Sequence, residues 1–139
     1  MLGIILTAHG KAASGILSGL EMITGGGDNV KALDFTIENQ SSYANEIKNL
    51  IDEQLKKYEK VIVACDMAGG TPFNQSVLNG NGKNVKILAG LNFQMAYELV
   101  FSETDIDSTV ENALNSAKEG IIVFEEPDNN ENEDFSEGI

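Results

Sequence analysis

The chain has 139 residues and a formal net charge of −13, because 22 acidic residues face 9 lysines and no arginine. This length is typical of one domain, and a chain without a basic face is not expected to bind nucleic acid or an anionic membrane surface. A single cysteine and a single histidine exclude an intramolecular disulfide and a four-coordinate Cys/His zinc site.

The first predicted element is a strand over residues 2–7 (LGIILT), a continuous apolar run typical of strands buried on both faces. This run is too short for a membrane span or a signal peptide, and no basic stretch precedes it, so we expect a cytoplasmic protein. A helix should follow and end at the glycines of 25–27, because apolar residues recur at helical spacing: Ala13, Ile16, Leu17, Leu20 and Ile23.

Residues 30–35 predict a second strand, and the apolar stripe from Tyr43 to Leu55 predicts a second helix. Two further strands are expected over 60–66 and 84–90. Between them, Thr71 and Pro72 mark a helix start, with proline at the first helical position.

The pattern beyond residue 90 is less regular. Met95, Tyr97, Leu99 and Phe101 are interpreted as packing residues without an assigned element. Ser108 and Glu111 form a capping-box pattern for a last helix, which Gly120 should end before a short strand over 121–124 (IIVF).

The last segment, residues 125–139, contains seven acidic residues and no basic one. A segment with such a high like charge and so few apolar residues cannot bury enough surface to fold. We therefore expect one domain over residues 1–124, followed by a disordered acidic tail over 125–139.

The alternation of strands and helices predicts an α/β fold, with a parallel sheet covered by helices on both faces. For so short a chain the commonest arrangement is flavodoxin-like, with strand order 2-1-3-4. In this order the first and third strands are neighbours, and ligands bind beyond their carboxyl ends. The expected site therefore comprises the loops 7–11 and 66–74.

His9 and Asp66 stand at these two strand ends and are the candidate catalytic pair. A carboxylate that accepts one imidazole N–H fixes the tautomer and leaves the other ring nitrogen as a nucleophile or base. The glycines at 69 and 70 lead into a helix N-terminus, where backbone N–H groups can bind an anion. Because arginine is absent, this is the expected place for a phosphoryl group.

The predicted phosphate-binding residues are Gly69, Gly70 and Thr71, with Thr71 as both helix cap and hydroxyl donor to the anion. Further residues are candidates for the border of the site, although Asn92 fits a turn equally well: Thr7, Gly10, Met67, Ala68 and Asn92. Cys65 lies inside an apolar run without a neighbouring cation, so we interpret it as a core residue.

Each of these features alone also has a structural explanation. A lone histidine is often simply exposed, an aspartate at a strand end often caps a helix, and paired glycines can serve only a tight turn. Their coincidence at the expected ligand-binding edge favours a functional site. Two other functions remain open: a hydrolase with Thr71 as nucleophile, His9 as base and Asp66 as orienting residue, or a flavodoxin-like ligand-binding module without catalysis.

Three motifs carry a resemblance to a known family: T-A-H-G at 7–10, D-x-x-G-G-T-P-F-N at 66–74, and A-G-x-N-x-x-M at 89–95. Over residues 1–124 the chain resembles the enzyme IIA component of the mannose family of the bacterial phosphoenolpyruvate:sugar phosphotransferase system. The phosphocarrier subunit of the dihydroxyacetone kinase system shares the fold and the early histidine. Its glycine-rich loop lacks the G-G-T-P-F-N form, so it ranks lower.

The resemblance implies a phosphotransferase component with a phosphohistidine intermediate and no cofactor or metal. His9 would accept a phosphoryl group on Nε2 from phospho-HPr and donate it to the IIB component. Asp66 would orient the ring through Nδ1, and Thr71 would help to hold the phosphate. Family members are homodimers whose last antiparallel strand crosses to the partner, which implies that role for residues 121–124.

Overall fold

The computed structural model describes residues 1–102 and 105–128. Strands and helices alternate along the chain in this order: β1 (Gly3–His9), α1 (Ala12–Thr24), β2 (Val30–Phe35), α2 (Tyr43–Lys57), β3 (Val61–Cys65), α3 (Thr71–Gly80), β4 (Val85–Ala89), α4 (Phe93–Val100) and α5 (Ile106–Glu119). The strands form one parallel sheet in the order β2-β1-β3-β4, which confirms the predicted α/β class and strand order.

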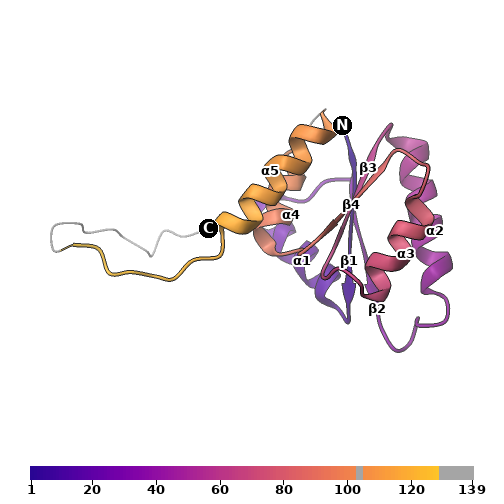
Figure 1. Ribbon diagram of the computed structural model, residues 1–139, viewed down its shortest axis with the longest axis horizontal. Coiled ribbons are helices and arrows are strands. Elements are labelled where there is room, and N and C mark those ends of the chain that lie inside the picture. Colours follow the sequence, from indigo (N-terminus) through magenta and orange to yellow (C-terminus); the bar gives the residue numbers. More distant parts are fainter. Residues whose placement is uncertain (103–104, 129–139) are drawn as a thin grey trace.

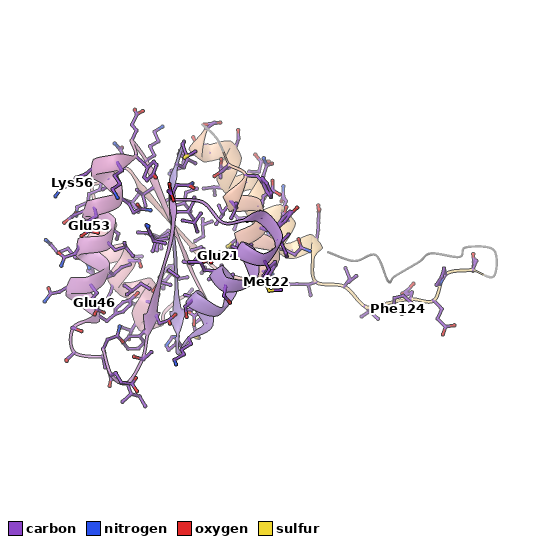
Figure 2. The ribbon with its side chains drawn as sticks, turned by 180° about the vertical axis from the view of Figure 1, so that it is seen from behind. Glu21, Met22, Glu46, Glu53, Lys56 and Phe124 are labelled. Atoms are coloured by element: carbon purple, nitrogen blue, oxygen red, sulfur yellow. The ribbon has the colours of Figure 1, made fainter. Side chains whose placement is uncertain are left out.

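Two layers of helices enclose the sheet, with α2 and α3 on one face and α1, α4 and α5 on the other (Figure 1). Successive side chains of a strand point to opposite faces of the sheet, and a helix layer covers each face, so the central strands are buried on both sides. Ile4 and Leu6 of β1 join the core beneath α1, α4 and α5, whereas Ile5 joins the core beneath α2. Figure 2 shows Glu46, Glu53 and Lys56 on the outer side of α2, away from the sheet.

The N-terminal half of the chain forms close to the predicted boundaries. The first helix ends where the sequence indicates, at Gly25, whose φ of +79° is the left-handed conformation that glycine adopts readily. Strand β1 continues past its predicted end at residue 7 and includes His9. This extension makes His9 the last residue of a central strand.

The predicted start of the last helix is wrong. Helix α5 begins at Ile106, and its N-cap is Asp105, whose carboxylate accepts hydrogen bonds from the Ser108 backbone N–H (3.3 Å) and hydroxyl (2.6 Å). Ser108 therefore lies inside the first turn as a hydrogen-bond donor. An aspartate satisfies the open amides of a first turn as well as a serine does, so both patterns fitted the sequence.

The sequence pattern did not predict α4. The alternate positions Met95, Tyr97, Leu99 and Phe101 obscure its helical spacing, but in the structure Met95, Ala96 and Leu99 are its buried residues. A helix of 8 residues offers only about two turns of periodicity. The missed signal is Asn92, which occupies the N-cap and accepts a hydrogen bond from the Met95 N–H.

The predicted strand over 121–124 is absent from the single chain. Residues 121–128 contain neither helix nor strand, and Ile121, Ile122 and Val123 are 77%, 79% and 83% exposed. The segment leaves the end of α5 and runs away from the folded body, with Phe124 along it (Figures 1 and 2). A strand needs a neighbouring strand to pair with, and the sheet of the described residues comprises β1 to β4 alone. Most of the predicted acidic tail, residues 129–139, lies outside the described residues.

No helix in the described part of the chain combines the length and the hydropathy that crossing a lipid bilayer requires.

Candidate active site

The candidate pair lies at the carboxyl edge of the two central strands. His9 ends β1, and Asp66 follows β3, which pairs with β1 up to Thr7 and Cys65. The Nδ1 atom of His9 lies 2.7 Å from Oδ2 of Asp66. The structure thus brings together the two side chains that the strand order predicted to meet.

The carboxylate of Asp66 accepts three hydrogen bonds. Its Oδ2 atom accepts both the ring Nδ1–H and the backbone N–H of His9, the latter at 3.0 Å. Its Oδ1 atom accepts the backbone N–H of Met67, also at 3.0 Å. Because an ionised carboxylate can only accept, Nδ1 carries a hydrogen, and in the neutral ring the lone pair is then on Nε2. This tautomer is the one that a nucleophilic Nε2 requires.

Two opposing effects set the pKa of Asp66. Partial burial raises this pKa. The hydrogen bonds from His9, the charge of that ring and the Met67 N–H lower it, and together they outweigh the effect of burial. The net pKa lies below the ordinary value of 3.8. Asp66 is therefore ionised at neutral pH and can balance positive charge on the imidazole.

The ring of His9 is held on more than one side. Its side chain is 46% exposed, so burial alone does not fix its orientation. The ring of Phe35 makes an edge contact with it, with centroids 5.6 Å apart and an interplanar angle of 80°. On another side, a Cβ atom built on Gly70 would lie 2.8 Å from Cε1 and 3.6 Å from Nε2 of His9.

The two glycines before α3 serve different purposes. Gly69 has a φ of +86°, so the turn itself requires glycine. Gly70 has a φ of −79°, which any residue can adopt, but its missing side chain leaves room for the His9 ring. The amide of Asn74 donates to the Gly69 carbonyl at 3.1 Å and ties this loop to the helix.

The start of α3 differs in one respect from the prediction. The N-cap is Gly70, and Thr71 is the first helical residue, so Thr71 is not the helix cap. No side chain caps α3, which leaves the amides of its first turn available for an anion. Because Gly70 lies against the His9 ring, this helix N-terminus is close to Nε2.

The candidate border residues fall into different surroundings. Met67 and Ala68 are exposed beside Asp66, and Gly10 turns away from β1 with a φ of +60° while its N–H donates to the Phe35 carbonyl at 2.7 Å. Thr7 is fully buried beneath the site. The side chain of Asn92 accepts a hydrogen bond from the Met95 N–H and donates one to the Ala117 carbonyl, so Asn92 caps α4.

The sequence did not single out Phe35 or Tyr43, although both pack behind His9. Phe35 is level with His9 in the register between β1 and β2, and this register is the signal that could have found it.

The predicted core position of Cys65 is confirmed, and burial raises the pKa of its thiol to about 11. Within residues 1–102 and 105–128, the side-chain hydrogen bonds of His9 go to Asp66 and none joins it to Thr71. No cluster of potential metal ligands occurs in that same part of the chain.

Comparison with known proteins gives a consistent result. The family model EIIA-man, described as "PTS system fructose IIA component", matches residues 3–124. A curated relative, the "PTS system mannose-specific EIIAB component" of Escherichia coli K12, is 28% identical over 124 residues, which cover 86% of this chain. The chain spans only 38% of the length of that relative.

Solved structures share the fold. A phosphotransferase system component EIIA from Streptococcus agalactiae is 32% identical and superposes with a TM-score of 0.77, over 88% of this chain and 97% of the other. A PTS IIA protein associated with the fucose utilization operon of Streptococcus pneumoniae is 34% identical, with a TM-score of 0.72 over 83% and 90% of the two chains. The mannose/sorbose specific IIA subunit from Enterococcus faecalis, at 23% identity and a TM-score of 0.76, covers 91% and 96% and shows the same fold.

Proposed function

The chain belongs to the EIIA-man family of phosphotransferase system IIA components, and from this premise we propose that it is a phosphocarrier of a sugar-transporting system. In this proposal His9 accepts a phosphoryl group on Nε2 and then passes it on. The contact of 2.7 Å between Nδ1 and Asp66 supports it most strongly, because it leaves the Nε2 lone pair of a partly exposed side chain for attack on phosphorus.

The transfer needs few groups from the protein. The Nε2 lone pair attacks the phosphorus of a donor phosphohistidine, a new P–N bond forms, and the old P–N bond breaks to release the donor imidazole. The ring of His9 becomes positively charged during this step, and the ionised Asp66 stabilises that charge through the Nδ1–H. Phosphoryl transfer depends mainly on such positioning and charge stabilisation.

The phosphoryl oxygens would lie against the start of α3. The backbone amides of its first turn are not capped by a side chain, and the helix dipole favours a negative charge there. Thr71 is exposed at the first helical position and would add a hydroxyl donor, while Gly69 and Gly70 shape the loop. This arrangement binds phosphate without arginine, which the chain lacks.

We propose HPr as the donor and a IIB component as the acceptor, with the reaction in the cytoplasm. A histidine that is 46% exposed at a sheet edge can be reached by another protein in both directions of transfer. The E. coli relative carries the description EIIAB, and this chain matches 38% of its length, which fits a IIA unit that acts with a IIB unit.

We also propose a homodimer in which residues 121–124 of one chain pair with the other. Strand β4 is at the edge of the sheet, and its outer side has no neighbouring strand in the described fold. Open strand edges pair readily with added strands, and an exposed apolar segment such as 121–123 gains by being covered. The partner's segment would add to this edge as an antiparallel strand.

The test of the carrier function is an intact-mass measurement after incubation with phosphoenolpyruvate, enzyme I and HPr. The wild-type chain should gain one acid-labile phosphoryl group, and His9→Ala should gain none. Labelling of folded His9→Ala to the same extent would refute the assignment, as would an unlabelled wild type with a cognate HPr.

A further inference from the structure

A second layer of side chains lies behind the reactive histidine. The ring of Phe35, at the end of β2, contacts His9 on one side and Tyr43 on the other. The Phe35 and Tyr43 rings are 5.0 Å apart, with an interplanar angle of 70°. Edge contacts of this geometry between aromatic rings are attractive and directional.

Tyr43 gives this layer a fixed position. It is completely buried at the start of α2, and its hydroxyl lies 2.6 Å from the hydroxyl of Thr7. The Thr7 hydroxyl donates its own hydrogen to the Leu33 carbonyl at 2.8 Å, so Tyr43 must be the donor to Thr7. Burial raises the pKa of Tyr43, which keeps its phenol protonated for this bond.

The hydroxyl contacts of Tyr43 and Thr7 connect β1, which carries His9, with β2, which carries Phe35. Thr7 stands two residues before His9 on β1, and Leu33 stands two residues before Phe35 on β2. The register sets Thr7 beside Leu33 and His9 beside Phe35. A shift of Tyr43 would therefore move Phe35 relative to His9 as well as loosen the hydroxyl bonds below them.

The exposed ring of His9 needs such a support. Asp66 fixes one atom of the imidazole, Nδ1, but a single hydrogen bond leaves the ring able to tilt about that contact. Phe35 limits the tilt on the side where its ring makes the edge contact with His9. Tilting would carry Nε2 away from the start of α3, where the phosphoryl oxygens are expected.

We propose that Phe35 is a positioning residue for His9, held in place by the buried Tyr43, and that it keeps Nε2 aimed at the helix N-terminus. This role rests on the proposed phosphocarrier function. Phe35 takes no part in bond making, because its side chain offers neither a proton nor a lone pair. Its effect is on the orientation of the imidazole, and through it on the Nδ1–H bond to Asp66 that fixes the tautomer.

The test compares Phe35→Leu with Phe35→Tyr and with Phe101→Leu. Leucine keeps an apolar side chain but removes the ring, whereas tyrosine restores it. Phe101 is a matched control on the far helix layer, since it makes a similar edge contact with Tyr97, with centroids 5.0 Å apart and an angle of 67°. Two quantities are measured: the rate of phosphoryl transfer from phospho-HPr, and the ¹⁵N shifts of the two His9 ring nitrogens without any donor.

We expect Phe35→Leu to slow transfer about tenfold and to move both ¹⁵N shifts toward those of a solvent-exposed histidine with mixed tautomers. Phe35→Tyr and Phe101→Leu should stay close to wild type in both measurements. Unchanged shifts in Phe35→Leu would overturn the proposal, whatever the rate, because the ring would then be equally well oriented without Phe35. Equal losses in Phe35→Leu and Phe101→Leu would also overturn it.

The two measurements separate this proposal from the carrier function. If the wild type accepts no phosphoryl group, the function fails, but the ¹⁵N shifts still decide whether Phe35 orients His9. The chain has a single histidine, so both ring signals are assigned without ambiguity.

Discussion

Asp66 binds the backbone and the ring of His9 through the same oxygen atom. The orientation of the imidazole is thereby tied to the end of β1 and not only to a flexible side-chain contact. The other carboxylate oxygen accepts the Met67 N–H, which fixes the carboxylate plane. A proton-accepting partner fixed in this way selects one tautomer of the ring.

Replacement of Asp66 by asparagine should slow phosphoryl transfer by at least about tenfold while the fold persists. The amide can still accept the His9 backbone N–H, but it carries no charge to stabilise the ring during attack. Rapid-quench measurement of transfer from phospho-HPr gives the rate. Asp34→Asn is the matched control. Like Asp66, the Asp34 carboxylate accepts a backbone N–H and a side-chain hydrogen bond from one residue, but that residue is Ser14 in α1 and not His9. Equal rates for Asp66→Asn and wild type would contradict the orienting role.

Gly70→Ala should impair transfer without preventing folding. The backbone at Gly70 suits alanine, but the new Cβ would lie 2.8 Å from Cε1 of His9, so the ring must move. We expect transfer to fall by about tenfold or more, since small displacements of reacting atoms are costly.

Gly15→Ala is the control for this substitution, because nothing lies within 4 Å of the Cβ at this position inside α1. It should stabilise the chain by roughly 0.5–1 kcal/mol in denaturant unfolding and leave transfer unchanged. A Gly70→Ala variant with a wild-type transfer rate would show that the close approach to His9 has no functional importance.

At the scale of secondary-structure elements, the central strands β1 and β3 were predictable because each is an apolar run buried between the two helix layers. A glycine marked the C-terminal end of α1, and a proline marked the start of α3, because the backbone preferences of these residues act locally. Helix α4 was missed because two turns give too little periodicity, and the start of α5 was misplaced because two capping patterns overlapped there.

The cap of α5 can be tested by two substitutions. Asp105→Ala should reduce the free energy of unfolding by about 1 kcal/mol, because the Ser108 N–H loses its acceptor. Ser108→Ala should cost less, since it removes the hydroxyl donor and retains the N–H bond to Asp105. Chemical denaturation of both variants measures the difference. A larger loss in Ser108→Ala would support the capping box that the sequence pattern indicated.

The site was predictable only in part. The strand order alone indicated that His9 and Asp66 would meet, because neighbouring strand ends share one edge of the sheet. The contact between His9 and Phe35 depends on the exact register of β1 and β2 and on side-chain rotamers, which no local pattern encodes. The same holds for Gly70, whose pattern suggested a turn or a phosphate contact and whose closest neighbour is the His9 ring.

At the scale of the whole molecule, Ile121, Ile122 and Val123 form an apolar run after α5 that is largely exposed in the single chain. Deletion of residues 121–139 should therefore convert the proposed dimer into a monomer, whereas deletion of 125–139 should leave it dimeric. Light scattering coupled to gel filtration gives the molar mass of each variant. The same number of chains per particle for both truncations and the full chain would refute the proposed exchange of residues 121–124.

The central claim is that His9 carries the phosphoryl group on Nε2 while Nδ1 stays bonded to Asp66. It is tested most directly by ¹⁵N and ³¹P NMR of the phosphorylated protein with labelled histidine, because His9 is the single histidine of the chain. We predict a phosphorus coupling to Nε2 and a protonated Nδ1. A phosphoryl group on Nδ1, or on a residue other than His9, would contradict the account.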